Sequence, residues 1–235
     1  MKKTFRYETH VHTAECDGSA ALGAAEIVRR YAEAGYAGLI ITDHIIDVFE
    51  KRWFPEEVKG LDHEQYITRW LRGYHAAKEE GDRLGLTVLL GGEVRFDGQV
   101  NDYLLYGLDE DFFYTVPRLN YCQSLEEMLA LLPPDVCVVQ AHPFRDKMVV
   151  ADPSLLWGLE GFNGGNPKFR NELAKIYAEH YGKAITSGSD YHGRRRFASG
   201  GIETEEEIHT PQDLTRILRS GRYTLIENYK TTDSF

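Results

Sequence analysis

The sequence predicts an α/β protein whose strands close into a β/α barrel, with residues 1–235 forming a single domain. Three observations support this fold class. Short apolar runs alternate along the chain with segments of helical periodicity, which favours parallel β/α organisation. Several of the apolar runs end in a residue that can bind a metal ion. The length of 235 residues is enough to build one complete barrel with its core.

Composition excludes several classes of protein. The chain is 42% hydrophobic and 27% charged, as in ordinary globular proteins, and it has no apolar run that could span a membrane. Residues 1–6 lead into no apolar segment, so we expect no signal peptide. Cys16, Cys122 and Cys137 lack C-x-x-C spacing, which indicates reduced thiols and a cytoplasmic location. The net charge of −10 argues against binding to long nucleic acid but allows a small anionic substrate.

The first third of the chain contains two expected strands and a helix between them. Residues 5–12 form the first strand, and residues 23–34 have helical periodicity that ends at Gly35. Residues 37–42 are an almost unbroken apolar run, typical of a buried parallel strand. Residues 46–62 mix aromatic and charged side chains, and we interpret them as a long loop, either a lid beside a pocket or a peripheral loop.

The remaining elements follow the same alternation. A helix with an aromatic stripe for the core begins after Asp62, its expected N-cap. Ser124 opens a short helix, Pro167 begins another, and the last helix runs from Thr210 to Gly221. The expected strands cover residues 87–91, 103–107, 136–139, 159–162 and 184–186.

The stretch Thr9-His10-Val11-His12-Thr13 proposes a metal site. In an extended backbone residues i and i+2 point to the same side, so both imidazoles can face one ion. Asp17 follows five residues after the second histidine. Two imidazoles at one strand end supply half of a metal site. The alternative is a surface strand with two chance histidines, and the later apolar runs argue against it.

Four later runs end in further candidate ligands. Because the carboxyl ends of the strands in a β/α barrel meet on one face, residues far apart in sequence are expected to come together there. The candidate ligands are His10, His12, Asp17, His44, Glu93, His142, Asp190 and His192. Eight nitrogen and oxygen donors are too many for one tetrahedral ion, but they suit two or three divalent ions that share a bridging carboxylate.

Taken together, the motifs resemble those of the polymerase-and-histidinol-phosphatase (PHP) family. The matching blocks are H-x-H followed by D-G, then T-D-H, G-x-E, H-P and G-S-D-x-H, and the resemblance extends from Glu8 to about Ile226. It implies a distorted seven-stranded β/α barrel, similar to a TIM barrel, that holds up to three Zn, Mn or Fe ions. It also implies a metal-dependent phosphoesterase in which a metal-bound hydroxide attacks phosphorus.

The resemblance also implies how the ligands divide among three sites. The first site would contain His10, His12, Glu93 and Asp190; Glu93 would bridge to a second site with His142; Asp17, His44 and His192 would hold a third ion. Many relatives have another histidine on the strand after the bridging glutamate, and residues 101–106 contain none. Asn101, Asp102, or water and substrate are the alternatives there, and neither residue is included among the predicted ligands.

Three more residues are predicted to act beside the metals. Asp43, next to His44, is expected to orient an imidazole, and we group it with Arg145 as catalytic. Arg145 follows His142 by three residues, and its guanidinium could hold phosphate oxygens through two hydrogen bonds. Arg194, in the run 194–196, is a second candidate for binding substrate, although a solvated basic turn explains that run as well.

The predicted function is therefore hydrolysis of a small phosphate ester, either a phosphomonoester or a nucleotide-type substrate. Two alternatives remain: a metal-dependent amidohydrolase-type enzyme, and a non-catalytic metal-binding PHP module. An arginine-lined pocket would favour phosphate over a neutral amide. We expect no membrane partner, and the sequence leaves the oligomeric state open.

Overall fold

The computed structural model describes residues 2–47, 52, 54–193 and 195–229. Within them, one sheet curves into a nearly closed barrel, with strand order β10-β9-β1-β2-β4-β5-β6-β7-β8 and β3 paired to β4. The strands are β1 (Phe5–Val11), β2 (Gly38–Ile41), β3 (His44–Ile45), β4 (Thr87–Arg95), β5 (Asp102–Tyr106), β6 (Cys137–Gln140), β7 (Gly158–Asn163), β8 (Ala184–Gly188), β9 (Ile202–Thr204) and β10 (Thr224–Leu225).

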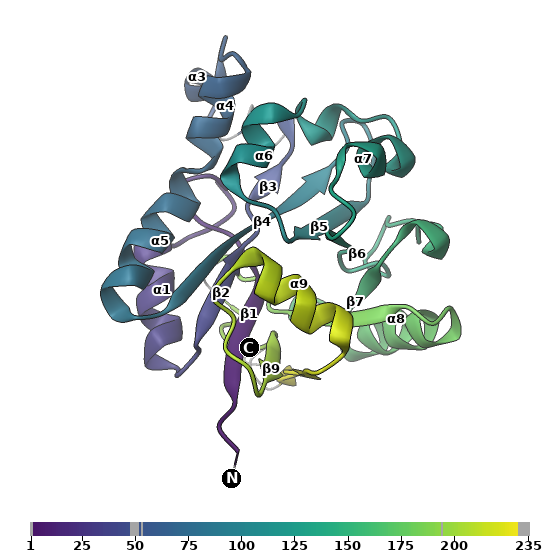
Figure 1. The fold of residues 1–235 in the computed structure, drawn as a ribbon. Helices are drawn as coiled ribbons and strands as arrows, with labels where there is room; N and C mark the ends of the chain where they lie inside the picture. Colours follow the sequence, from purple (N-terminus) through teal and green to yellow (C-terminus); the bar gives the residue numbers. More distant parts are fainter. Residues whose placement is uncertain (1, 48–51, 53, 194, 230–235) are drawn as a thin grey trace.

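Helices surround this sheet, with α1 and α5 on one side and α8 on the other (Figure 1). Their bounds are α1 (Ala24–Glu33), α3 (Pro55–Val58), α4 (His63–Trp70), α5 (Arg72–Leu84), α6 (Glu110–Thr115), α7 (Leu125–Leu131), α8 (Lys168–His180) and α9 (Pro211–Ser220). The expected caps are present: Asp62 and Thr210 both form capping boxes, and the Ser124 side chain accepts from the Glu127 amide. No helix in the described part of the chain is long and apolar enough to cross a bilayer.

The barrel is less regular than the alternating pattern predicted. Strand β5 runs antiparallel to both β4 and β6, and β9 runs antiparallel to β1. Residues 96–101 connect β4 to β5, which is shorter than the roughly dozen residues that a parallel crossover needs, so these strands form a hairpin. This reversal places the first residue of β5, and not its last, beside the carboxyl end of β4.

Two helix predictions need correction. The helix expected after Asp62 is divided at Leu71 into α4 and α5. Residues 46–62, predicted as a long loop, contain the helical turn α3, while 48–51 and 53 lie outside the described residues. The predicted aromatic stripe does enter the core, since Tyr66 and Trp70 are both buried.

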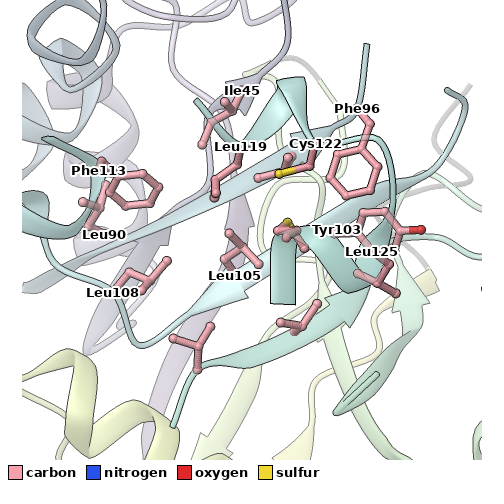
Figure 2. Close-up of a cluster of buried hydrophobic side chains, with 14 of the residues drawn as sticks. Ile45, Leu90, Phe96, Tyr103, Leu105, Leu108, Phe113, Leu119, Cys122 and Leu125 are labelled. Carbon is pink, nitrogen blue, oxygen red and sulfur yellow. The ribbon is translucent and has the colours of Figure 1, made fainter. Parts of the chain in front are cut away.

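A large hydrophobic cluster fixes one wall of the barrel. Leu90 on β4, together with Tyr103 and Leu105 on β5, contacts side chains from the helices and loops outside the sheet, including Phe113 (Figure 2). Replacing one buried leucine of such a cluster by alanine typically costs about 2–5 kcal/mol. This packing holds the β4–β5 hairpin in place, and with it Glu93 and Asp102.

The barrel closes between β1 and the residues that follow β8 through backbone and side-chain hydrogen bonds. An isolated parallel bridge joins Val11 to Tyr191, beyond the end of β8. The buried Glu8 carboxyl group accepts from the amide of Ser189 at 2.8 Å and from the hydroxyl of Tyr31 at 3.0 Å, and it also contacts the Ser189 hydroxyl. Burial raises the pKa of Glu8. One buried carboxyl group therefore joins the first strand to the end of the last barrel strand.

Replacing Glu8 by alanine should weaken this closure. The Ser189 and Tyr31 donors would lose a buried acceptor, and because each unsatisfied group costs roughly 1–3 kcal/mol, we expect the free energy of unfolding to fall by about 2–4 kcal/mol. Urea unfolding measures this change, and Glu33→Ala on the exposed face of α1 is the matched control. Equal unfolding midpoints for the two variants would contradict this role of Glu8.

Candidate metal centre

The structure brings all eight predicted ligands into one cluster at one end of the barrel. They form three groups: His10, His12 and Asp190; His12, Asp17, His44 and His192; and Glu93 and His142 with Asp102. Nearly all of these side chains are buried, with His44 and His192 partly exposed. Residues from both ends of the chain therefore share one small volume.

The first group has the spacing of a tetrahedral site. The Nε2 atoms of His10 and His12 lie 3.1 Å apart, and each is 3.3 Å from Glu93 Oε2. Asp190 Oδ1 lies 3.7 and 3.6 Å from the same two nitrogens. Metal–ligand bonds of about 2.0–2.1 Å in a tetrahedron place the ligand atoms roughly 3.3–3.4 Å apart. These four donors fit one transition-metal ion.

The group around Asp17 is built mainly from imidazoles. Asp17 Oδ2 lies 2.7 Å from His44 Nδ1 and 3.5 Å from both His192 Nε2 and His12 Nδ1. The His12 ring stacks on that of His44, with centroids 4.4 Å apart, and lies beside that of His192 at 4.3 Å. His12 therefore contributes to both of these groups.

Glu93 connects the remaining group to the other two. Its Oε1 atom lies 3.1 Å from His142 Nε2, while its Oε2 atom lies 3.0 Å from His44 Nε2 as well as facing His10 and His12. The two oxygens of this carboxylate thus face different groups. This is the geometry expected of a bridging carboxylate.

Asp102 belongs to the third group, although it was left out of the predicted ligands. It is fully buried, and its Oδ2 atom lies 3.6 Å from His142 Nε2. Asn101 points elsewhere, and its side-chain oxygen accepts from the Val149 amide. The sequence offered Asp102 only as one alternative, because the predicted ligands follow apolar runs, whereas the antiparallel β5 presents a residue that precedes one.

The charges in this cluster favour a bound cation. Burial opposes protonation of His10, but Glu160, Glu93 and Asp190 outweigh that effect and raise its pKa well above its ordinary value. Burial likewise opposes ionisation of Glu93, yet the neighbouring imidazoles hold its pKa well below the usual range. Among the described residues, the buried Nδ1 atoms of His12 and His142 have no hydrogen-bond partner. Clustered carboxylates and unpartnered imidazole nitrogens suit a divalent metal ion.

Glu160, on β7, contacts two of the candidate ligands and was not singled out from the sequence. Its Oε1 atom lies 2.8 Å from His10 Nδ1, and its Oε2 atom accepts from the backbone amide of His142 at 2.9 Å and from Asn163 Nδ2 at 2.8 Å. A carboxylate in this position fixes the ring orientation and tautomer of a metal-binding histidine. Nothing in the weak apolar pattern of residues 159–162 distinguished it.

Asp43 has a different partner from the imidazole that we expected. Its carboxylate accepts from the Thr13 amide at 2.6 Å and from the Thr13 hydroxyl at 2.7 Å. Burial raises the pKa of Asp43 to about 7. A Cβ atom at Gly73 would lie 1.9 Å from the Thr13 hydroxyl, so only glycine lets α5 approach this loop. Asp43 therefore holds the turn between His12 and Asp17, and its catalytic role stays a prediction.

Two candidate ligands have left-handed backbones. The φ angles of His142 and Asp190 are +32° and +51°. Non-glycine residues in this region carry strain of roughly 1–3 kcal/mol and persist only where surrounding contacts impose it. Glu160 holds the His142 amide, and Asn163 Nδ2 donates to Asp190 Oδ2 at 3.3 Å. Lys147, Arg196 and Ala198 also have positive φ angles, so this conformation is not confined to the candidate ligands.

Arg145 lies beside the cluster and contacts a candidate ligand directly. Its Nη2 atom pairs with Asp190 Oδ2 and donates to Asn163 Oδ1 at 3.1 Å. Its side chain is 30% exposed and lines a cavity of about 690 Å³ next to the cluster. The cavity lining consists of Ser19, Arg145, Gly165, Asn166, Arg170, Asp190, His192, Arg195 and Arg196. Arg194, predicted to bind substrate, lies outside the described residues.

Comparison with known proteins agrees with this fold. Residues 168–223 match the family model PHP_C, described as PHP-associated. No curated protein sequence matches the chain significantly. A two-domain protein from Bacteroides vulgatus, containing a predicted PHP-like metal-dependent phosphoesterase, is similar in structure over 97% of this chain, with a TM-score of 0.67 and 14% identity. This chain covers 66% of that protein.

Two further similar structures belong to proteins with other named activities. An amidohydrolase from Chromobacterium violaceum with bound sulfate has a TM-score of 0.56 and 16% identity, covering 95% of this chain and 99% of its own. The lesion-specific endonuclease EndoQ from Pyrococcus furiosus has a TM-score of 0.60 and 14% identity, covering 95% and 58%. At these identities the likeness concerns the fold alone. The family match and the barrel together support the resemblance to the PHP domain family that the sequence motifs indicated.

Glu160→Gln tests the support of His10. The amide keeps the size of the side chain but loses the charge that stabilises the His10 ring, so metal affinity should fall by about 10- to 100-fold. Competition with a chelator of known affinity measures this fall, and Glu179→Gln at the exposed end of α8 is the control. Unchanged affinity in Glu160→Gln, with both variants folded, would refute the supporting role.

Proposed function

We propose that this chain is a metal-dependent phosphoesterase that hydrolyses a small phosphate ester. The observation that supports this best is the cavity in which candidate metal ligands and four arginines lie together: Arg145, Arg170, Arg195 and Arg196. Guanidinium groups form paired hydrogen bonds with the charged oxygens of a phosphoryl group. A neutral amide substrate would gain little from four neighbouring positive charges. The phosphoesterase named in the Bacteroides structure agrees with this choice.

The protein groups have separate tasks in this proposal. Divalent ions held within the cluster of predicted ligands would supply an activated water and neutralise charge on the phosphoryl oxygens. Arg145 both holds Asp190 in position and faces the cavity, where it binds a nonbridging oxygen. Glu160 keeps the His10 ring oriented throughout. The remaining arginines of the cavity bind the anionic part of the substrate.

Two alternatives have specific support. The Chromobacterium structure is named an amidohydrolase, and the Pyrococcus structure is an endonuclease that acts on damaged nucleic acid. The net charge of −10 disfavours a long nucleic-acid partner, because a phosphate backbone binds to extended basic surfaces.

We also retain a cytoplasmic location as a proposal, since Cys16, Cys122 and Cys137 are buried free thiols.

A substrate screen separates these functions. Protein reconstituted with Mn²⁺ or Zn²⁺ should hydrolyse phosphate monoesters or short nucleotide substrates, and should lose that activity on chelation. Amide substrates and lesion-containing duplex DNA are assayed in parallel. Turnover of amides alone would favour the amidohydrolase, cleavage of DNA alone the endonuclease, and no turnover of any substrate a binding module.

Glu93→Gln tests the bridging role. Removing the charge of a carboxylate that faces all three groups should lower metal content by more than one ion and reduce kcat by orders of magnitude, while the barrel stays folded. Elemental analysis and steady-state kinetics on the same sample measure both effects. A variant with full metal content and full activity would exclude Glu93 as a ligand.

Arg145→Ala tests the phosphate contact. Loss of one charged hydrogen-bonding group is worth roughly 1.5–3 kcal/mol, so kcat/KM for a phosphate ester should fall by about 10- to 150-fold. Arg145→Lys should recover only part, since an ammonium group cannot make the paired hydrogen bonds. Because Arg145 also contacts Asp190, metal content is measured in the same samples. Arg216→Ala on the exposed face of α9 is the control, and equal kcat/KM in the two alanine variants would exclude Arg145 from substrate binding.

A further inference from the structure

The group formed by Glu93, Asp102 and His142 has a positively charged side chain, that of Arg95, directly beside it. The guanidinium of Arg95, at the end of β4, forms a paired contact with Asp102: Nε lies 2.6 Å from Oδ1, and Nη2 contacts Oδ2. Asp102 is fully buried, and the Arg95 side chain is only 21% exposed. An arginine guanidinium is charged at any physiological pH, so this contact is a buried ion pair.

Asp190 and Asp102 both contact arginine, but they differ in which carboxylate oxygen makes the contact. Asp190 contacts Arg145, Asn163 and Arg196 through Oδ2, whereas its other oxygen, Oδ1, faces His10 and His12. At Asp102 the oxygen that faces His142 is Oδ2, and Oδ2 is the oxygen that Arg95 Nη2 already holds. Asp190 therefore offers a metal ion an oxygen that no arginine contacts, and Asp102 does not.

The charges point in the same direction. Asp102 and Arg95 neutralise each other, which leaves His142 and a share of Glu93 to attract a divalent ion. The other two groups have a carboxylate and at least two imidazoles each. A guanidinium within hydrogen-bonding distance of a ligand oxygen also repels a second cation at that oxygen, and burial strengthens the repulsion.

We propose that Arg95 takes the place of a third metal ion, so that the chain holds two divalent ions and one fixed guanidinium. This inference rests on the metal centre of the proposed function and specifies its composition. The two ions lie with His10, His12, Glu93 and Asp190, and with Asp17, His44 and His192. Arg95 supplies positive charge on the His142 side of Glu93, where it is always present and independent of metal supply.

The test is a count of bound ions. Wild-type protein and variants are dialysed to equilibrium against the same buffered concentration of free Mn²⁺, and metal per chain is then measured by elemental analysis. We expect two ions in wild type and three in Arg95→Met, which removes the charge and frees both oxygens of Asp102. Arg95→Lys keeps the charge and should stay at two. Arg216→Met is the control for loss of an exposed arginine.

Each outcome has a distinct meaning. Three ions in wild type, or two in a folded Arg95→Met, would overturn the inference while leaving the metal centre intact. Wild-type protein without bound metal would overturn the metal centre itself and the inference with it. If circular dichroism shows that Arg95→Met is unfolded, Arg95→Gln supplies the same neutral comparison.

Discussion

The placement of Glu93 is the constraint on which the site depends. Its carboxylate lies within 3.3 Å of nitrogen atoms on four histidines from three different segments of the chain. It reaches them because two glycines precede it. A Cβ atom at Gly91 would lie 2.8 Å from a methyl group of Ile40 and 3.0 Å from the carbonyl oxygen of Leu105. Small residues there let β2 and β5 press against β4, which brings the buried carboxylate to the centre of the barrel mouth.

Much of this site could be predicted from sequence, because its logic is local. The alternation of a strand explains His10 and His12, and a ligand that follows an apolar run explains His44, Glu93 and His142. The sequence offered Asp102 only as one of several alternatives, and it did not indicate Glu160. Asp102 depends on the reversed direction of β5, and Glu160 acts through a partner on a distant strand, so neither leaves a pattern near its own position. The same reversal separates the observed sheet from the regular parallel barrel that alternation suggested.

The acidic character of the whole chain conceals a local balance of charge at the site. Carboxylates that face imidazoles on one side face arginines on the other, as Asp190 does with Arg145 and Arg196. Such pairing limits the free energy of burying several acidic groups together, since each unpaired buried charge would be costly. It also divides the surroundings into an inner ring that attracts cations and an outer ring that attracts anions. Under the proposed function, a phosphate substrate and the metal ions would therefore have separate places to bind.

The closure of the barrel between β1 and β8 has a consequence for how the protein is made and maintained. His10 lies on β1, whereas Asp190 and His192 follow β8, so the candidate ligands come together only after a long stretch of chain has been made. Contacts of such long range form late and slowly. A metal ion bound by both ends would act as a clasp, adding its binding free energy to the folded state alone. Protein without metal would then be less stable as well as inactive. The junction between β1 and β8 would open more often, and a protease could cut the chain there.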